Sequence, residues 1–269
     1  MKSYLDLLKL LPKTNCKECG EASCLLFALK VFSKNLSPEK CPYLPTDKLP
    51  SDFISKNLTF NQLIENLKYL KEKFRSLPQF WDRAKNLGCI PLPENKALYL
   101  PYLDLRIEIS LDEKDFPKEI KSSLETPLDP RDEILICNYF IFNGKSPLSY
   151  EYVGLEFFPH SISKVKTLNK YAEEPLAEFL SIPGIVIEEI LKDFEIINLV
   201  KSNSGISFDI RILPKVILSI HFWYGDIEEN LPPSCKILYD KNVLSYLDLE
   251  CLVFCAERFV ERLKTKVSH

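Results

Sequence analysis

The chain has 269 residues, of which 46% are hydrophobic and 27% are charged, and its formal net charge is −3. This length suffices for two domains, and the composition is that of a globular protein with a sizeable core. The small negative charge and the lack of a basic, aromatic-rich stripe argue against nucleic-acid binding, and no apolar run reaches the about eighteen residues of a membrane span.

The first eleven residues predict a short amphipathic helix, because Asp6 and Lys9 interrupt the leucines at helical spacing. The segment lacks the continuous apolar core and the small-residue cleavage site of a signal peptide. We therefore expect a cytoplasmic, reducing location, in which the nine cysteines are free thiols or ligands rather than disulfides.

Four cysteines dominate residues 1–50, which we predict to form a module of their own. Cys16, Cys19 and Cys24 lie within nine residues, and Cys41 follows after sixteen more, directly before Pro42. A cubane cluster needs such a set, because each of its irons takes one soft thiolate ligand. The spacing therefore predicts a [4Fe–4S] cluster and, with it, electron chemistry.

Two alternatives remain for these cysteines. A zinc site usually pairs two CxxC knuckles, and the second knuckle is missing here. A redox-active dithiol at Cys16 and Cys19 would follow a strand in a βαβ context, which the sequence does not predict.

The residues around the cysteines predict a tight loop followed by a helix. Gly20 can adopt the positive φ that such a loop needs. A helical run opens at Ala22 and is expected to end near Asn35, which places Cys24 in its first turn, where the helix dipole favours an anionic cluster. The apolar side expected to form a dry wall for the sulfurs carries Leu25, Leu26, Leu29 and Phe32.

Residues 51–90 are expected to be a helical linker. Residues 45–60 have little periodicity and contain Pro45 and Pro50. Thr59 and Gln62 then form a capping-box pattern, which predicts a helix that Pro78 ends. Its apolar seam consists of Leu63, Leu67, Leu70, Phe74 and Leu77.

Residues 91–269 predict a larger domain of mixed strands and helices. Alternating apolar residues predict strands over 103–111 and 206–212, and residues 216–224 are rich in strand-forming side chains. Helices are expected over 131–143, over 168–180 and from a Ser245–Asp248 cap to about Lys264. The elements come in blocks, so we expect an α+β fold, a small mostly helical module plus a larger mixed domain.

The run from Leu11 to Leu44 resembles the small [4Fe–4S] module of the corrinoid iron–sulfur protein large subunit and of the Rnf complex B subunit. The shared features are the Leu-Pro-x-Thr-Asn-Cys lead, the Cys-Gly-x-x-x-Cys middle and the closing Cys-Pro. The resemblance implies that the ligands are Cys16, Cys19, Cys24 and Cys41. One departure is Lys17, because these modules often have glycine after the first cysteine.

The region from about residue 90 onward resembles a domain of unknown function (family 3786 type) of anaerobic bacteria and archaea. No activity follows from this resemblance, and no corrinoid-binding barrel of βα units is expected. The matching stretches are Pro127–Arg131, Pro214–Leu218, Trp223–Glu229, Leu238–Asp240 and Tyr246-Leu247 leading to Glu250.

Candidate residues for further chemistry are sparse in this region. His221 shares a strand face with Ser219 and Trp223, and an ordinary structural role is as open to it as a ligand role. Acidic residues after that strand could rim a pocket, and Arg131 lies between two aspartates at an expected helix start, where capping explains the aspartates equally well. The residues are Asp226, Glu228 and Glu229 in the first group and Asp129, Arg131 and Asp132 in the second.

Cys251 and Cys255 lie four residues apart on the last helix, and with Cys235 and His221 they could form a second metal site. The alternative is that they are core residues of an apolar helix, where a free cysteine behaves as a small hydrophobe. The seven glycines form no phosphate loop and no dinucleotide fingerprint, which disfavours the standard nucleotide-using enzymes.

Two functions are compatible with this pattern. The first is a cytoplasmic [4Fe–4S] cluster protein that transfers electrons or senses redox state, with a C-terminal domain that docks a redox partner protein. The second is an accessory factor or enzyme of corrinoid or one-carbon metabolism, with a ligand site around His221, Asp226 and Arg131. A purely structural cluster is a third reading, and whether the chain is an enzyme stays open.

Overall fold

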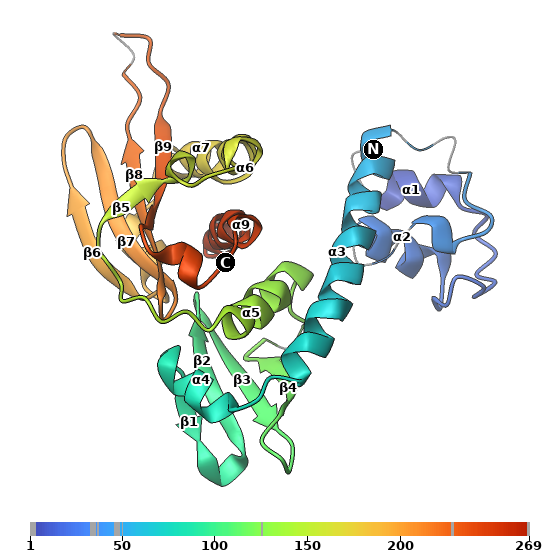
Figure 1. Ribbon diagram of the computed structural model, residues 1–269. Helices are drawn as coiled ribbons and strands as arrows, with labels where there is room; N and C mark the ends of the chain where they lie inside the picture. The colour runs from blue at the N-terminus through green and yellow to red at the C-terminus, as the bar shows by residue number, and fades with distance from the viewer. Residues whose placement is uncertain are drawn as a thin grey trace. The chain divides into compact units, whose positions relative to one another are not determined.

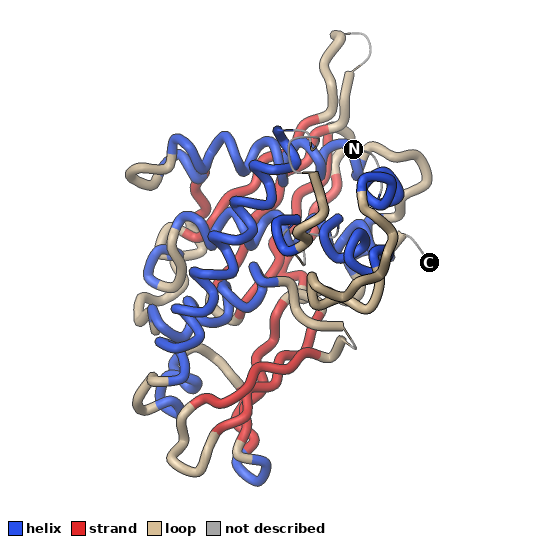
Figure 2. Tube along the Cα trace, turned by 90° about the vertical axis from the view of Figure 1, so that its right-hand side faces the viewer, coloured by secondary structure: helices blue, strands red, loops and turns tan. Residues whose placement is uncertain are grey.

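The computed structural model describes residues 4–32, 36, 38–45, 49, 51–124, 126–226 and 229–267 (Figures 1 and 2). The chain divides into two compact units, Met1–Tyr69 and Leu70–His269, and the long helix α3 contains the point of division. Each unit has a core of its own and is described by itself. The boundaries expected after residues 50 and 90 remain predictions.

The first unit is built from short helices around a small apolar core. Its described elements are α1 (Tyr4–Leu10), α2 (Cys24–Phe32), the 3-10 turn η1 (Pro38–Lys40) and the first part of α3 (Ser51–Arg75). Cys24 and Cys41 are themselves members of the core. The other buried members are Leu7, Leu11, Phe27, Ala28, Val31, Leu44 and Leu49.

The expected orientation of α2 is wrong. The face that packs inward carries Cys24, Phe27, Ala28 and Val31, because these residues recur at three- and four-residue spacing. The side chains predicted to wall the sulfurs point outward instead, and between 37% and 45% of their surface is exposed. They are Leu25, Leu26, Leu29 and Phe32.

Two helix boundaries in this unit differ from expectation. α2 begins at Cys24 rather than Ala22, and its predicted end at Asn35 lies outside the described residues. α3 begins at Ser51, so the Thr59–Gln62 box is not its start. Pro50 directly precedes Ser51, and no further proline occurs before Pro78, so nothing interrupts the helix between them.

The second unit begins with a four-stranded antiparallel sheet of order β1-β2-β3-β4. Its inner face is apolar, with Leu98, Leu100, Ile107 and Ile109 buried, and its outer face is polar. The elements are α4 (Phe80–Asn86), β1 (Ile90–Leu92), η3 (Pro93–Asn95), β2 (Ala97–Tyr102), β3 (Leu105–Leu111), β4 (Pro117–Ser122) and α5 (Pro130–Phe142).

A second antiparallel sheet follows, of order β5-β9-β8-β7-β6. Figure 1 shows α6, α7 and α9 on one side of this sheet. Its strands are β5 (Tyr152–Gly154), β6 (Ile196–Lys201), β7 (Gly205–Leu213), β8 (Val216–Trp223) and β9 (Ser234–Asp240). The remaining elements are η4 (Leu155–Phe157), α6 (Ile162–Leu168), the π-helical turn η5 (Asn169–Glu173), α7 (Glu174–Leu180), α8 (Ile187–Leu191), η6 (Val243–Ser245) and α9 (Leu249–Thr265).

The helix expected over residues 168–180 begins earlier, at Ile162, and consists of three consecutive pieces, α6, η5 and α7. Pro175 explains the π-helical turn, because proline has no amide hydrogen and its ring clashes with the carbonyl four residues earlier, so the hydrogen-bond ladder widens just before it. Glu173 in this turn is buried, and its Oε1 accepts a hydrogen bond from Ile237 N at 3.0 Å.

Two smaller expectations are also corrected. The strand predicted from residue 103 starts at Leu105, because Leu103 has a φ of 52° in the turn between β2 and β3. Leu103 is nevertheless buried, which is why the alternating pattern includes it. Asp248 alone is the N-cap of α9, since Ser245 lies in η6.

The α+β prediction is confirmed, since every strand pair is antiparallel and the helices flank the sheets. In the part of the chain that the structure describes, no helix is both long and apolar enough to cross a membrane.

The Asp248→Ala variant should lower the free energy of unfolding of the second unit by about 1 kcal/mol, because Cys251 N loses its 2.8 Å bond to Asp248 Oδ1. Asp248→Asn keeps an accepting oxygen and should retain most of that stability. Both tryptophans, Trp81 and Trp223, lie in this unit, so urea unfolding followed by tryptophan fluorescence measures the difference. Equal losses for the two variants would contradict the capping role.

Candidate iron–sulfur site

The loop before α2 is fixed by side-chain hydrogen bonds. Residues 12–17 belong to no helix or strand. Cys24 N–H donates to Asn15 Oδ1 at 2.8 Å, and Leu26 N–H donates to Ser23 Oγ at 3.1 Å, so Ser23 caps the helix. These two bonds hold the loop that carries Cys16 against the first turn of α2, which begins with Cys24.

The backbone of this loop alternates in handedness. Lys13, Asn15 and Lys17 have φ values of 58°, 51° and 66°, whereas Thr14 and Cys16 between them are not in the positive-φ region. Positive-φ residues can direct successive amides toward one side of a loop, as in the anion-binding nests of many Fe–S sites, so we call residues 13–19 the nest. Gly20 has a φ of 83°, so the prediction for that residue is confirmed.

The amides of this nest are available for a ligand. Within the described residues, none of the backbone N–H groups from Lys13 to Cys19 donates a hydrogen bond, and the first that does is Gly20 N–H, to Lys17 O at 2.9 Å. Buried cluster sulfurs commonly accept hydrogen bonds from the backbone, and such bonds help to set the reduction potential. The loop therefore has the donors that an anionic cluster requires.

The four thiols differ in how deeply they are buried. Cys24 and Cys41 are buried, Cys19 is half-buried, and Cys16 is exposed. Burial raises the pKa of the Cys41 thiol, and the neighbouring thiols of Cys19 and Cys24 raise it further, against the lowering effect of the amides of Tyr43 and Leu44. Thiolates this close repel one another, so a bound cation is needed to hold them all ionised.

The donor set fits a cluster. It consists of four soft sulfur atoms, the ligands that iron–sulfur clusters use. Among the described side chains, no three Cys, His, Asp or Glu groups converge on a point that one metal ion could occupy. What fits a cluster is therefore the chemistry of the donors, four soft thiols.

The contacts of Arg131 are those of a structural residue. It lies at the start of α5, where Asp129 is the N-cap and accepts a hydrogen bond from Arg131 N at 2.9 Å. The guanidinium binds Asp129, Glu257 and Glu261 at 2.7–3.0 Å, which joins α5 to α9. Burial acts to lower the pKa of Arg131, but these carboxylates outweigh it and raise the pKa.

A buried ion pair lies beside Arg131. Asp132 accepts two hydrogen bonds from Arg258, at 2.7 and 2.8 Å, and one from Tyr102 Oη at 2.5 Å. Burial and the Asp132 carboxylate together raise the pKa of Tyr102 well above its usual range. Because all three side chains satisfy one another, this cluster fastens α9 and β2 to α5.

His221 lies on β8, where its Nε2 is 3.2 Å from Ser219 Oγ and its ring stacks on Trp223 with 6.1 Å between centroids. Asp226 lies beyond the strand, where its Oδ1 accepts from Glu229 N at 3.1 Å in a turn. Glu228 lies outside the described residues. The structure thus places His221 in β8, Arg131 in α5 and Asp226 in an isolated bridge to Leu231.

The structure does not bring together the residues considered for a second metal site. In the β8–β9 register Cys235 pairs with Phe222 and Lys236 with His221, so Cys235 and His221 face opposite sides of the sheet. Cys251 and Cys255 are buried in α9, and Cys251 Sγ accepts a hydrogen bond from Asn138 Nδ2 at 3.2 Å. Cys251 and Cys255 are therefore core residues, as the alternative interpretation of the sequence proposed.

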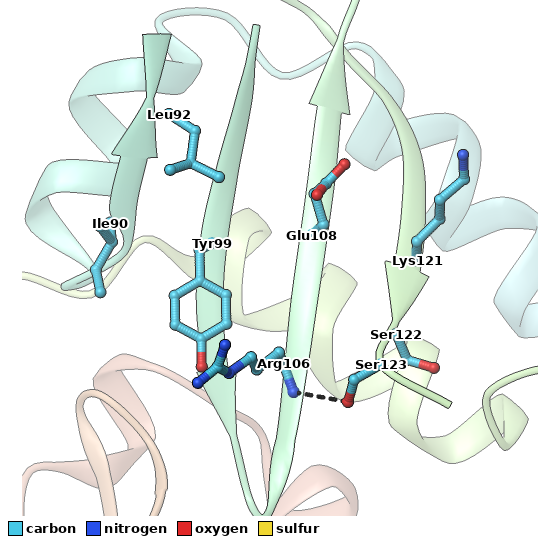
Figure 3. A pocket seen from close by; sticks show the side chains of 8 residues that line it. All are labelled: Ile90, Leu92, Tyr99, Arg106, Glu108, Lys121, Ser122 and Ser123. Atoms are coloured by element: carbon cyan, nitrogen blue, oxygen red, sulfur yellow. Dashed lines mark hydrogen bonds between the residues drawn. The ribbon is translucent and has the colours of Figure 1, made fainter. Parts of the chain in front are cut away.

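Sequence reasoning did not identify the open pocket on the outer face of the first sheet (Figure 3). The pocket has a volume of about 490 Å³. Glu108 pairs across the sheet with Tyr99 and with Lys121, and Arg106 N donates to Ser123 Oγ at 3.2 Å. The sequence signal for this pocket was the row of alternating polar residues in the strand at 105–111, among them Arg106 and Glu108. The lining residues are Ile90, Leu92, Tyr99, Arg106, Glu108, Lys121, Ser122 and Ser123.

Comparison with known proteins assigns the larger part of the chain. Residues 79–262 match the family model for a domain of unknown function, DUF3786. The chain belongs to the DUF3786 family. Residues 11–43 match a second model, described as "Putative Fe-S cluster", so this DUF3786 protein carries an iron–sulfur module ahead of its family domain.

The relatives of this DUF3786 protein match the N-terminal module alone. The acetyl-CoA decarbonylase/synthase complex subunit gamma of Methanocaldococcus jannaschii is 52% identical over 46 residues, 17% of this chain and 9% of the relative. The corrinoid/iron-sulfur protein large subunit of Moorella thermoacetica is 48% identical over 40 residues, 15% of this chain and 9% of the relative. The chain thus spans about a tenth of the length of these curated relatives.

The expected resemblances to the corrinoid iron–sulfur subunit and to the domain of unknown function are confirmed. The match of residues 11–43 supports an iron–sulfur cofactor. No solved structure matches the chain.

The Lys17→Gly variant should stabilise the first unit by about 0.5–1 kcal/mol, because glycine adopts a positive φ without the steric cost that lysine incurs. Hydrogen exchange of the α2 amides measures this free energy. Thr14→Gly is the matched control: Thr14 lies outside the positive-φ region, so glycine there should destabilise the unit by a similar amount. Equal effects of the two glycines would contradict the assigned loop conformation.

Proposed function

We propose that this DUF3786 protein is a cytoplasmic [4Fe–4S] protein that transfers single electrons or senses redox state. Its cluster ligands are Cys16, Cys19, Cys24 and Cys41. The observation that carries the proposal is a set of four soft thiols, two buried in the core of the module and two toward its surface, on and beside a loop whose amides are unbonded within the described residues. The bound cluster would supply reversible one-electron exchange at low potential.

The residues of the first unit have distinct tasks in this proposal. The loop amides from Lys13 to Cys19 would be the donors to cluster sulfur, and such bonds stabilise the more negative, reduced state and raise the potential. Burial of Cys24 and Cys41 excludes water on the inner side and disfavours added negative charge. The exposed Cys16 would be the edge of a bound cluster nearest to a redox partner.

The larger domain docks a partner in this proposal. We keep residues 1–50 as the cluster module, 51–90 as a helical linker and 91–269 as the partner-docking domain. The relatives of the module are named as subunits of an acetyl-CoA decarbonylase/synthase complex and of a corrinoid/iron-sulfur protein. Their names support a redox partner protein from corrinoid or one-carbon metabolism.

The same names favour a second candidate function, an accessory factor or enzyme of that metabolism with a ligand site in the DUF3786 domain. The pocket beside Tyr99, Arg106 and Glu108 is the described cavity that such a ligand would use. Titration with a cobamide should then change its visible spectrum, and Arg106→Gln should weaken the binding. A spectrum that does not change on titration would contradict this second function.

Iron and acid-labile sulfide analysis of anaerobically purified protein tests the main proposal. We expect about four irons per chain, an electron paramagnetic resonance signal on reduction and a reversible one-electron couple. Cys41→Ala should lose most of the iron, while Cys235→Ala, a matched cysteine of the second unit, should keep it.

Zinc in place of iron would overturn the proposal. So would full iron content in Cys41→Ala protein, because the fourth iron would then lack its assigned ligand. A loaded cluster without any one-electron couple would contradict the electron-transfer role and leave a structural cluster, whose removal should unfold the module.

A further inference from the structure

The outward face of α2 is apolar. Leu25, Leu29 and Phe32 follow one another at helical spacing, and Leu26 adjoins them. Lys30, the one charged residue of this helix, binds Glu21 at 2.8 Å. An exposed helix face normally carries polar residues, so a continuous apolar face marks a surface that another molecule covers.

This apolar face begins at the candidate cluster. Leu25 directly follows Cys24, and the loop with the exposed Cys16 is bonded to the same helical turn through Asn15. A molecule that covers the face therefore lies next to the most accessible ligand. Electron-transfer complexes bury little surface and act transiently, so four apolar side chains suit such a contact.

The charges beside this face are positive. Lys13 and Lys17 are exposed, and neither has a carboxylate partner within the described residues. Among the acidic side chains of the module whose contacts are described, Asp6 pairs with Lys9 and Glu21 with Lys30. Glu18 accepts a hydrogen bond from the neutral Tyr43 hydroxyl and keeps its charge. Two lysines against this one carboxylate leave the side chains of the loop with a net positive charge, which favours a negatively charged partner.

We propose that Leu25, Leu26, Leu29 and Phe32, with Lys13 and Lys17, form a docking face for an acidic electron-carrier protein. The carrier presents an apolar patch bordered by carboxylates. One electron passes from the reduced carrier to the oxidised cluster, so the carrier loses the electron that the cluster gains. This inference rests on the proposed function.

Binding to an acidic two-cluster bacterial ferredoxin tests the docking face. Isothermal titration calorimetry with both proteins oxidised measures association without electron transfer. We expect Leu25→Gln/Leu29→Gln to weaken binding by about tenfold or more, since the central apolar contacts of an interface carry most of its affinity. Lys13→Glu/Lys17→Glu should also weaken binding and flatten its dependence on salt.

Matched controls come from outside the proposed face and outside residues 91–269. Leu5→Gln changes a side chain that is 48% exposed on α1, and Lys85→Glu reverses an exposed charge on α4; both should bind as the wild type does. The rate at which ferredoxin reduces the cluster should fall with the affinity, whereas reduction by dithionite should not change.

Three results would contradict the docking face: wild-type protein that does not bind the ferredoxin, unchanged affinity of Leu25→Gln/Leu29→Gln, or self-association that this variant abolishes. The last result would assign the face to a second copy of the chain. Iron analysis of the same samples distinguishes a failure of the proposed cluster function from a failure of the docking face. Missing iron contradicts the proposed function, while the binding isotherm still decides on the docking face.

Discussion

The loop from Pro12 to Ser23 has almost no backbone hydrogen bonds of its own, so the bond from Cys24 N–H to Asn15 Oδ1 determines where it lies. Asparagine suits this position because its short side chain tolerates positive φ and accepts a hydrogen bond locally. With Asn15 fixed, the alternating backbone turns the amides on either side away from internal partners. The arrangement of the thiols and the supply of free donors thus depend on one side chain.

The sequence was sufficient for features that depend on spacing and turn chemistry. The positive φ of Gly20, the place of Cys24 in the first turn of a helix and the strands over 206–212 and 216–224 all follow from local rules. The buried face of α2 could not be predicted, because its residues other than Lys30 are apolar and every face looks like a core face. Pro175 also produces a π-helical turn only because tertiary packing continues the helix past it.

In the DUF3786 domain, the charged residues that attracted attention in the sequence are mostly structural. Asp129 caps α5, and Arg131 and Asp132 connect this helix to α9. A buried pair such as Asp132–Arg258 is costly to break, by about 3–5 kcal/mol, because one charge is left without its partner. Interpretation from sequence could not separate these roles, since an aspartate that caps a helix and one that catalyses a reaction have the same local pattern.

The proposed site for one cubane cluster consists of the exposed Cys16, the half-buried Cys19, the buried Cys24 and Cys41, and the unbonded amides of the loop. Mössbauer spectroscopy of protein grown on ⁵⁷Fe tests this claim most directly, because it reports the nuclearity and valence of all the iron. The account predicts the spectrum of a single [4Fe–4S] cluster, which Cys41→Ala loses. Iron that is mononuclear or binuclear in the wild-type protein would contradict it.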